Sequence, residues 1–252
     1  MIGIFDSGSG GLTVVHAIRQ YLPSADILYF GDIRNAPYGE KSREVLSRLT
    51  INAIKLLQAR GATSIVSACN SVSASLAISL FDALDIEPQH LIEMVGPTVS
   101  YFKNFKQPIL LAATGATIDS EIYQSAFRML NIKIDTVAIP KLAGAIEFGI
   151  PEIDQERLIT AAFAPLDMKK YGAIILACTH YPLAPRAFRK VLGDAPFFDP
   201  AEAVAERVEK QLWPREAGNG KTRFIVSKDT EQFRARVAKL FPDATYTLEV
   251  IK

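Results

Sequence analysis

The sequence predicts an α/β protein made of two similar units, each with a mainly parallel sheet and flanking helices. Short apolar, β-branched runs alternate with segments of helical periodicity along all 252 residues, a pattern typical of parallel sheets connected by helices. A second observation is a short internal repeat of sequence. Ser-Ile-Val-Ser-Ala-Cys-Asn-Ser over 64–71 and Ile-Ile-Leu-Ala-Cys-Thr-His-Tyr-Pro-Leu over 174–183 both place Ala-Cys after an apolar run. This repeat predicts one such strand in each unit, with a cleft between the units.

The expected strands are short runs of apolar and β-branched residues bounded by turn residues. The first, over 2–5, leads directly into the glycine-rich stretch Asp-Ser-Gly-Ser-Gly-Gly over 6–11. The strand over 26–30 is followed by a long loop over 31–39, and loops of this kind commonly carry functional residues. In full, we expect strands over residues 2–5, 26–30, 64–68, 90–95, 108–113, 133–139, 173–177, 197–200, 223–227 and 245–250.

The expected helices have apolar residues spaced three and four positions apart. The first follows the glycine-rich stretch, so its N-terminus offers free N–H groups to an anion such as a carboxylate. The helix over 42–60 ends at Gly61, a common helix-terminating residue. In full, we expect helices over residues 12–21, 42–60, 73–84, 120–130, 142–148, 154–163, 185–192, 201–212 and 230–240, and one more after Gly96-Pro97.

The charge of the chain is nearly balanced, with 28 Lys and Arg against 27 Asp and Glu. A surface that binds nucleic acid needs an excess of basic residues, so we expect no nucleic-acid partner. No apolar run approaches the ~20 residues that span a bilayer, and the opening Met-Ile-Gly-Ile-Phe lacks the features of a signal peptide. We therefore expect a cytoplasmic protein with no membrane partner, in which thiols stay reduced.

Cys69 and Cys178 are the two cysteines of the chain, and each follows a predicted buried strand. Open α/β sheets place ligands and catalytic groups at this end of their strands. A thiol acts as a base when ionised and as an acid when protonated. Two thiols on opposite faces of one bound carbon can remove a proton from one face and return one to the other, which inverts the stereocentre. The alternatives are inert buried side chains or a structural disulfide.

Other polar residues at strand ends are candidates for the same site. His180 lies two residues after Cys178 and can orient the thiol or relay a proton, with a packing or capping role as the alternative. Asp6 is an N-cap, a carboxylate directed into the site, or both. Thr114 and Thr117 are helix caps or hydroxyl donors to a carboxylate ligand. The three histidines lie far apart in the sequence, so we expect no metal and no cofactor.

A series of motifs in a fixed order carries a resemblance to a known family. They are Ile-Phe-Asp-Ser-Gly-Ser-Gly-Gly-Leu-Thr over 4–13, Tyr-Phe-Gly-Asp over 29–32, Pro-Tyr-Gly-Glu-Lys-Ser over 37–42, Ala-Cys-Asn-Ser over 68–71, Ala-Thr-Gly-Ala-Thr-Ile-Asp-Ser over 113–120 and Leu-Ala-Cys-Thr-His-Tyr-Pro-Leu over 176–183, together with Tyr123, Asp199 and Ala201. Through them the chain resembles, over nearly its whole length, the glutamate racemases of the cofactor-independent aspartate/glutamate racemase family.

The resemblance implies a domain organisation and a set of site residues. Residues 1–93 and 202–252 would form a first α/β domain and residues 94–201 a second, with the substrate between them. Cys69 and Cys178 would be the acid/base thiols, assisted by the residues Asp6, His180 and Glu147. The expected substrate contacts are Asp6, Ser7, Tyr38, Gly39, Asn70, Ser71, Thr117, Thr179 and His180, together with Pro37 in the same loop as Tyr38 and Thr114 at its strand end.

We therefore expect a racemase that interconverts L- and D-glutamate. In the L-to-D direction Cys178 would remove the α-proton and Cys69 would donate one, while Asn70, Ser71 and Thr179 stabilise the carbanion-like state. The resemblance further implies a supply of D-glutamate for peptidoglycan and the capacity to form a homodimer. The alternatives are a racemase of aspartate or another acidic substrate, and a catalytically silent relative that binds a carboxylate.

Overall fold

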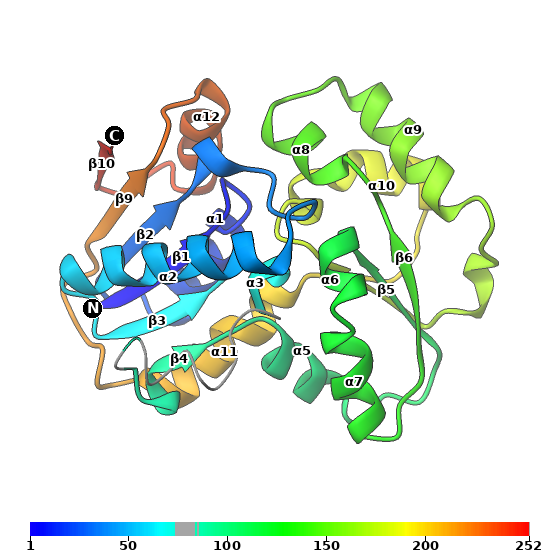
Figure 1. Cartoon of the computed structure of the whole chain (residues 1–252), viewed down its shortest axis with the longest axis horizontal. Helices are drawn as coiled ribbons and strands as arrows, with labels where there is room; N and C mark the ends of the chain where they lie inside the picture. Colours follow the sequence, from blue (N-terminus) through cyan, green and yellow to red (C-terminus); the bar gives the residue numbers. More distant parts are fainter. Residues whose placement is uncertain (74–83, 85, 252) are drawn as a thin grey trace.

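Two parallel sheets form the framework of the protein (Figure 1). The structure, a computed structural model, describes residues 1–73, 84 and 86–251. The first sheet has six strands in the order β10-β9-β2-β1-β3-β4, and the second has four in the order β6-β5-β7-β8. All neighbouring strands within both sheets pair in parallel. The predicted fold class is confirmed.

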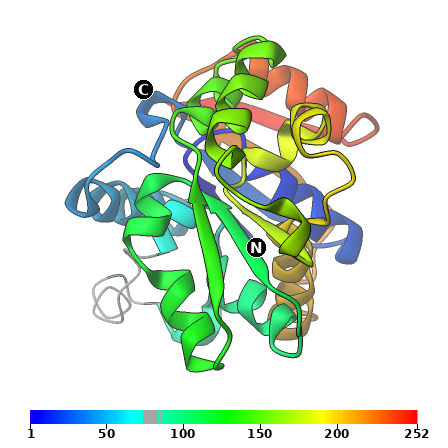
Figure 2. The ribbon, with the colours of Figure 1, turned by 90° about the vertical axis from the view of Figure 1, so that its right-hand side faces the viewer.

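The first sheet is built from the N-terminal part of the chain, with two more strands from its C-terminal end, and the second sheet is built from the middle of the chain. The first sheet contains β1 (Ile2–Asp6), β2 (Ile27–Gly31), β3 (Ser64–Ser67), β4 (Leu91–Ile92), β9 (Thr222–Val226) and β10 (Tyr246–Val250). The second contains β5 (Ile109–Ala113), β6 (Ile134–Ala138), β7 (Ala173–Ala177) and β8 (Phe197–Phe198). Since β9 pairs with β2, the end of the chain returns to the sheet that its beginning builds. Figure 2 shows the molecule with the second sheet in front.

Helices connect the strands and lie on both faces of the sheets. They are α1 (Leu12–Tyr21), α2 (Arg43–Ala59), α3 (Asn70–Ser73), α5 (Val95–Phe102), α6 (Gly115–Asp119), α7 (Ile122–Met129), α8 (Leu142–Glu147), α9 (Glu152–Phe163), α10 (Pro185–Leu192), α11 (Pro200–Leu212) and α12 (Glu231–Leu240). Of the helix expected over 73–84, residues 74–83 lie outside the described residues. None of the helices that the structure describes combines the length and the apolar character of a membrane span.

Alternate residues of the central strands pack on opposite faces, as expected for a sheet that is buried on both sides. Ile2 and Ile4 of β1 belong to a core with α1, α11 and α12, whereas Phe5 packs with α2. In the second sheet, Leu110 packs with α8, α9 and α10, and Leu111 with α5 and α7. The central strands are thereby packed between helices on both faces.

The strand expected over 90–95 is wrong for most of its length. Only Leu91–Ile92 pairs with β3, and α5 already begins at Val95. The cause is the carboxylate of Glu93, which accepts the backbone N–H of Val95 at 2.5 Å. Pro97 then lies in the first helical turn, where its missing N–H is not needed.

Candidate active site

The carboxyl ends of strands from the two sheets meet at one seam. Several side-chain hydrogen bonds cross it, and two of them join residues that end strands or shortly follow them. The hydroxyl of Thr179, after β7, donates to Asp6 Oδ1 at the end of β1, at 3.0 Å. The hydroxyl of Ser71, after β3, lies 3.0 Å from that of Thr114, after β5. The segments that the sequence predicted to carry chemistry therefore lie against one another.

A small cavity lies at this seam, and both cysteines line it. Its volume is about 10 Å³, close to the space that one water molecule needs. The thiols of Cys69 and Cys178 are free and buried. The other lining residues are Ser7, Pro37, Tyr38, Gly39, Asn70, Ser71, Thr114, Ala143, Thr179 and His180. All of these except Ala143 are residues that the sequence predicted for the site.

Asp6, Thr117 and Glu147, also predicted for the site, lie behind the cavity wall. Each is hydrogen-bonded to a lining residue: Asp6 to Thr179, Thr117 to Thr114, and Glu147 to His180. Thr114 also caps α6, because its hydroxyl accepts the backbone N–H of Thr117 at 3.3 Å. Thr114 therefore caps α6 and lines the cavity at the same time.

Cys69 lies between β3 and α3 in an environment that favours the protonated thiol. Burial, then the negative charge of Asp6, raise the pKa of the Cys69 thiol to about 12, although hydrogen bonds from Ser7 and from the backbone of Ser71 oppose the shift. Near neutral pH this group is a thiol. It is thus suited to donate a proton.

Cys178 has a different neighbourhood, a buried pair formed by His180 and Glu147. The imidazole Nε2 lies 2.6 Å from Glu147 Oε2. Burial acts to lower the pKa of His180, but hydrogen bonds with Cys178 and Glu147 outweigh it and the pKa rises. Burial acts to raise the pKa of Glu147, but hydrogen bonds from His180 and Ser9 outweigh it and the pKa falls. The pair is therefore an imidazolium with a carboxylate, and the imidazolium lies beside Cys178.

Two glycines of the loop after β1 allow this pair to approach the first sheet. A Cβ placed on Gly8 would lie 2.8 Å from Glu147 Oε2. A Cβ on Gly10 would lie 2.4 Å from the hydroxyl of Thr179 and 2.8 Å from His180 Nδ1. The glycine-rich loop thus serves a close approach between the two halves of the molecule.

Asp32 organises the loop that covers one side of the cavity. Its carboxylate accepts hydrogen bonds from Tyr38 at 2.6 Å, from Ser227 at 2.8 Å and from the side chain of Asn35. Tyr38 is buried and lines the cavity through this contact. The sequence marked the loop as a candidate, and the structure adds Asp32 as the residue that holds it.

The side-chain amide of Asn70, directly after Cys69, has a hydrogen-bond partner for its oxygen but not for its nitrogen among the described residues. Tyr123 donates to Asn70 Oδ1 at 2.6 Å, which fixes the orientation of the amide. The amide nitrogen is buried at the cavity and has no hydrogen-bond partner in the described part of the chain. Since an unpaired buried donor is costly, this group is available for a ligand with an acceptor oxygen.

Four residues at or near the site were not predicted as site residues from the sequence. Ala143 lines the cavity, whereas Ser9, Asp32 and Arg236 contact residues of the site. Ser9 and Arg236 both contact Glu147. Among the described residues, no three His, Cys, Asp or Glu side chains gather closely enough to hold a metal ion.

The fold and the site together define a class: proteins of two parallel α/β sheets that each bring one buried thiol to a shared cavity. The family described as Asp/Glu/Hydantoin racemase matches residues 11–208 of this chain. The chain belongs to that family. The resemblance inferred from the motifs is confirmed.

Relatives and solved structures agree with this assignment. The glutamate racemase of Lactobacillus helveticus is 35% identical over 210 residues, which is 81% of this chain and 78% of the relative. That of Thermus thermophilus is 32% identical over 243 residues, 95% of this chain and 91% of the relative. The crystal structure of a glutamate racemase from Francisella tularensis in complex with D-glutamate superposes with a TM-score of 0.86 at 28% identity, covering 100% of this chain and 97% of that one.

Proposed function

We propose that this protein is a glutamate racemase, an isomerase that interconverts L- and D-glutamate by acid/base chemistry at two thiols. Relatives at up to 35% identity that are glutamate racemases support the activity. The observation that carries the proposal is that Cys69 and Cys178, which come from different sheets, line one cavity. A single carbon bound between them would have a thiol on each face.

The reaction from L to D takes two proton transfers. The thiolate of Cys178 removes the α-proton, and the electron pair of the broken C–H bond stays on the α-carbon. The thiol of Cys69 then donates its proton to the opposite face, so that Cys178 ends as a thiol and Cys69 as a thiolate. The reverse reaction exchanges these roles. Asp6 acts beside Cys69, and the His180–Glu147 pair acts beside Cys178.

The remaining lining residues hold the amino acid and stabilise the carbanion-like intermediate. The amide nitrogen of Asn70 and the hydroxyls of Ser71 and Thr179 offer donors to the α-carboxylate, on which negative charge grows. Their stabilisation is needed because the α-proton is very weakly acidic. Ser7, Pro37, Tyr38, Gly39, Thr114 and Thr117 complete the proposed binding site.

The cellular setting follows from this activity. The product D-glutamate serves peptidoglycan synthesis, and the reaction takes place in the cytoplasm. We place the substrate between two domains, residues 1–93 with 202–252 and residues 94–201. We further propose that the chain has the capacity to form a homodimer.

The proposal is tested with Cys69→Ser and Cys178→Ser. Each variant should fold, as checked by circular dichroism, and should lose racemisation by about 10²- to 10⁴-fold. Chiral chromatography measures the conversion of glutamate and of aspartate, and NMR in heavy water measures exchange of the α-proton. We expect residual exchange in Cys69→Ser for L-glutamate only, and in Cys178→Ser for D-glutamate only.

Other results would favour the alternatives. Turnover of aspartate but not glutamate by the unmodified protein would identify a racemase of another acidic substrate. No α-proton exchange with either amino acid would identify a carboxylate-binding relative without turnover. Full activity in either cysteine variant would refute the two-thiol mechanism.

A further inference from the structure

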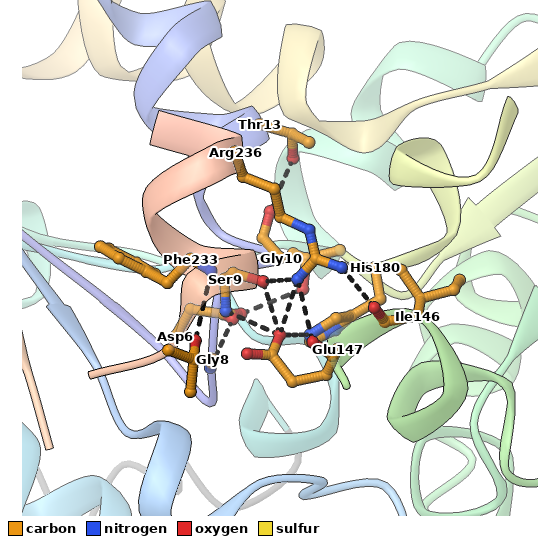
Figure 3. Close-up of polar contacts among 12 residues, drawn as sticks. Asp6, Gly8, Ser9, Gly10, Thr13, Ile146, Glu147, His180, Phe233 and Arg236 are labelled. Atoms are coloured by element: carbon orange, nitrogen blue, oxygen red, sulfur yellow. Dashed lines mark hydrogen bonds and ion pairs between the residues drawn. The ribbon is translucent and has the colours of Figure 1, made fainter. Parts of the chain in front are cut away.

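One arginine joins the two halves of the molecule behind the proposed active site (Figure 3). Arg236 lies on α12, which packs on the first sheet, and its guanidinium reaches α8 of the second half. One nitrogen donates to the hydroxyl of Ser9, to the backbone oxygen of Glu147 at 3.3 Å and to Glu147 Oε2 at 3.5 Å. The other nitrogen donates to the backbone oxygen of Ile146.

These contacts converge on the oxygen of Glu147 that His180 uses. Oε2 accepts from the imidazole at 2.6 Å, from the hydroxyl of Ser9 at 2.6 Å and from the backbone N–H of Ser9 at 3.0 Å, in addition to Arg236. The other oxygen, Oε1, is buried and has no partner among the described residues. The orientation of the carboxylate is therefore set by donors on one side only. Ser9 accepts from Arg236 and donates to Glu147, so it links the two.

The guanidinium also neutralises the end of a helix. α8 ends at Glu147, and the backbone oxygens of Ile146 and Glu147 lie in its last turn, where a positive charge is favourable. The Arg236 side chain is 17% exposed, so little water competes for these bonds. A flat, forked cation can reach the hydroxyl, the carboxylate and two carbonyls at once, which a lysine ammonium cannot.

We propose that Arg236 is a positioning residue: through Ser9 and the end of α8 it holds the ionised Glu147 against His180, and thereby keeps the imidazolium of His180 aligned beside Cys178. This inference rests on the proposed racemase activity. Arg236 does not line the cavity, so it has no contact with the reacting carbon. Its effect passes through Glu147.

The charges around Glu147 give the proposal a pH signature. Arg236 faces it from α12, and His180, which also contacts Cys178, faces it from the segment after β7. Tyr29 lies on β2, and burial, then the charges of Asp6 and Glu147 among others, raise the pKa of Tyr29. A nearby positive charge favours ionised acids. Removing it should make Glu147 harder to ionise, so the acidic limb of the pH profile of kcat/KM should move to higher pH.

The test compares Arg236→Gln, Arg236→Lys and the matched control Arg234→Gln. Arg234 lies on the same helix but pairs with exposed Asp229. We expect Arg236→Gln to lower kcat/KM for glutamate by about 10- to 100-fold. We also expect the acidic limb of the pH profile of kcat/KM to move to higher pH. Arg236→Lys should return the limb toward its original pH, because it restores the charge, while kcat/KM stays reduced because the fork is lost. Arg234→Gln should match the unmodified enzyme in both.

The results distinguish a failure of the proposed function from a failure of the proposed role of Arg236. If the unmodified protein does not racemise glutamate, the proposed function fails, and this inference with it. If it does, then unchanged kcat/KM in Arg236→Gln, or a reduced kcat/KM with an unshifted pH profile, overturns the positioning role and leaves the racemase assignment standing. If Arg236→Gln does not fold, as judged by circular dichroism and thermal unfolding, Arg236→Lys decides: a reduced kcat/KM supports the role and an unchanged one overturns it.

Discussion

Replacing Gly10 with alanine tests whether the close approach of the two halves sets the activity. The added methyl group would lie 2.4 Å from the Thr179 hydroxyl, 2.8 Å from His180 Nδ1 and 2.9 Å from the backbone carbon of Thr179. Rotation of the Thr179 side chain does not relieve the clash, because the backbone carbon is also in the way. To reach an ordinary contact of about 3.5 Å, the Thr179 hydroxyl must move by about 1.1 Å, and His180 Nδ1 and the Thr179 backbone carbon by about 0.6–0.7 Å.

A displacement of this size is large for a catalytic group. A misplacement of about 1 Å costs about 100-fold in rate where alignment of the reacting groups matters. We therefore expect Gly10→Ala to lower kcat/KM for glutamate by about that factor. Overpacking of this kind also lowers the free energy of unfolding by about 1–3 kcal/mol, so the variant should remain folded at room temperature.

The assay is racemisation followed by circular dichroism in both directions, with urea unfolding as the measure of stability. Gly115→Ala is the matched control, since a Cβ there would meet its nearest atom at 3.9 Å, an ordinary contact. The control should keep the activity and stability of the unmodified protein. If Gly10→Ala keeps a kcat/KM within a few-fold of it, the close approach is not a requirement and the reasoning fails.

Two further predictions concern the surroundings of the first thiol. In a Cys178→Ser background, Asp6→Asn removes a negative charge that helps burial to raise the pKa of Cys69, so the midpoint of iodoacetamide labelling, followed by mass spectrometry, should move to lower pH; an unchanged midpoint would contradict the role of the charge. Tyr123→Phe removes the donor to Asn70 Oδ1 and leaves a buried acceptor unpaired, which should lower the free energy of unfolding by about 1–3 kcal/mol and also reduce kcat/KM. An unfolding curve identical to that of the original protein would show that the bond contributes nothing.

The elements predicted best are those whose first and last residues are set by neighbouring glycines and prolines in the sequence. The helices expected over 12–21 and 185–192 occupy those residues, because turn-forming glycines precede the first and Pro185 and Gly193 delimit the second. The strand expected over 90–95 failed because the apolar pattern does not report that the carboxylate of Glu93 starts a helix. Such a cap depends on a single side-chain to backbone bond, which periodicity cannot show.

The site divides in a similar way. Residues with reactive or polar groups directly after strands, such as Cys69 and His180, could be predicted because parallel strands bring their carboxyl ends together. Arg236 could not, since α12 also carries Arg234 and Lys239 and its sequence does not say which cation faces the seam. That choice is made by how the second sheet packs against the first. Ser9 is likewise one small residue among glycines until Glu147 lies beside it.

The buried charges of the site explain when a thiolate can form there. The carboxylates of Asp6 and Glu147 are offset by the imidazolium of His180 and the guanidinium of Arg236, so the cluster balances while both thiols keep their protons. A thiolate adds one negative charge without a partner, and an unpaired buried charge is costly. An α-ammonium bound in the cavity would supply the missing positive charge next to the carbon that loses its proton. Ionisation of the thiol and binding of a protonated amino acid should therefore be coupled, which favours a base that becomes active only once its substrate is in place.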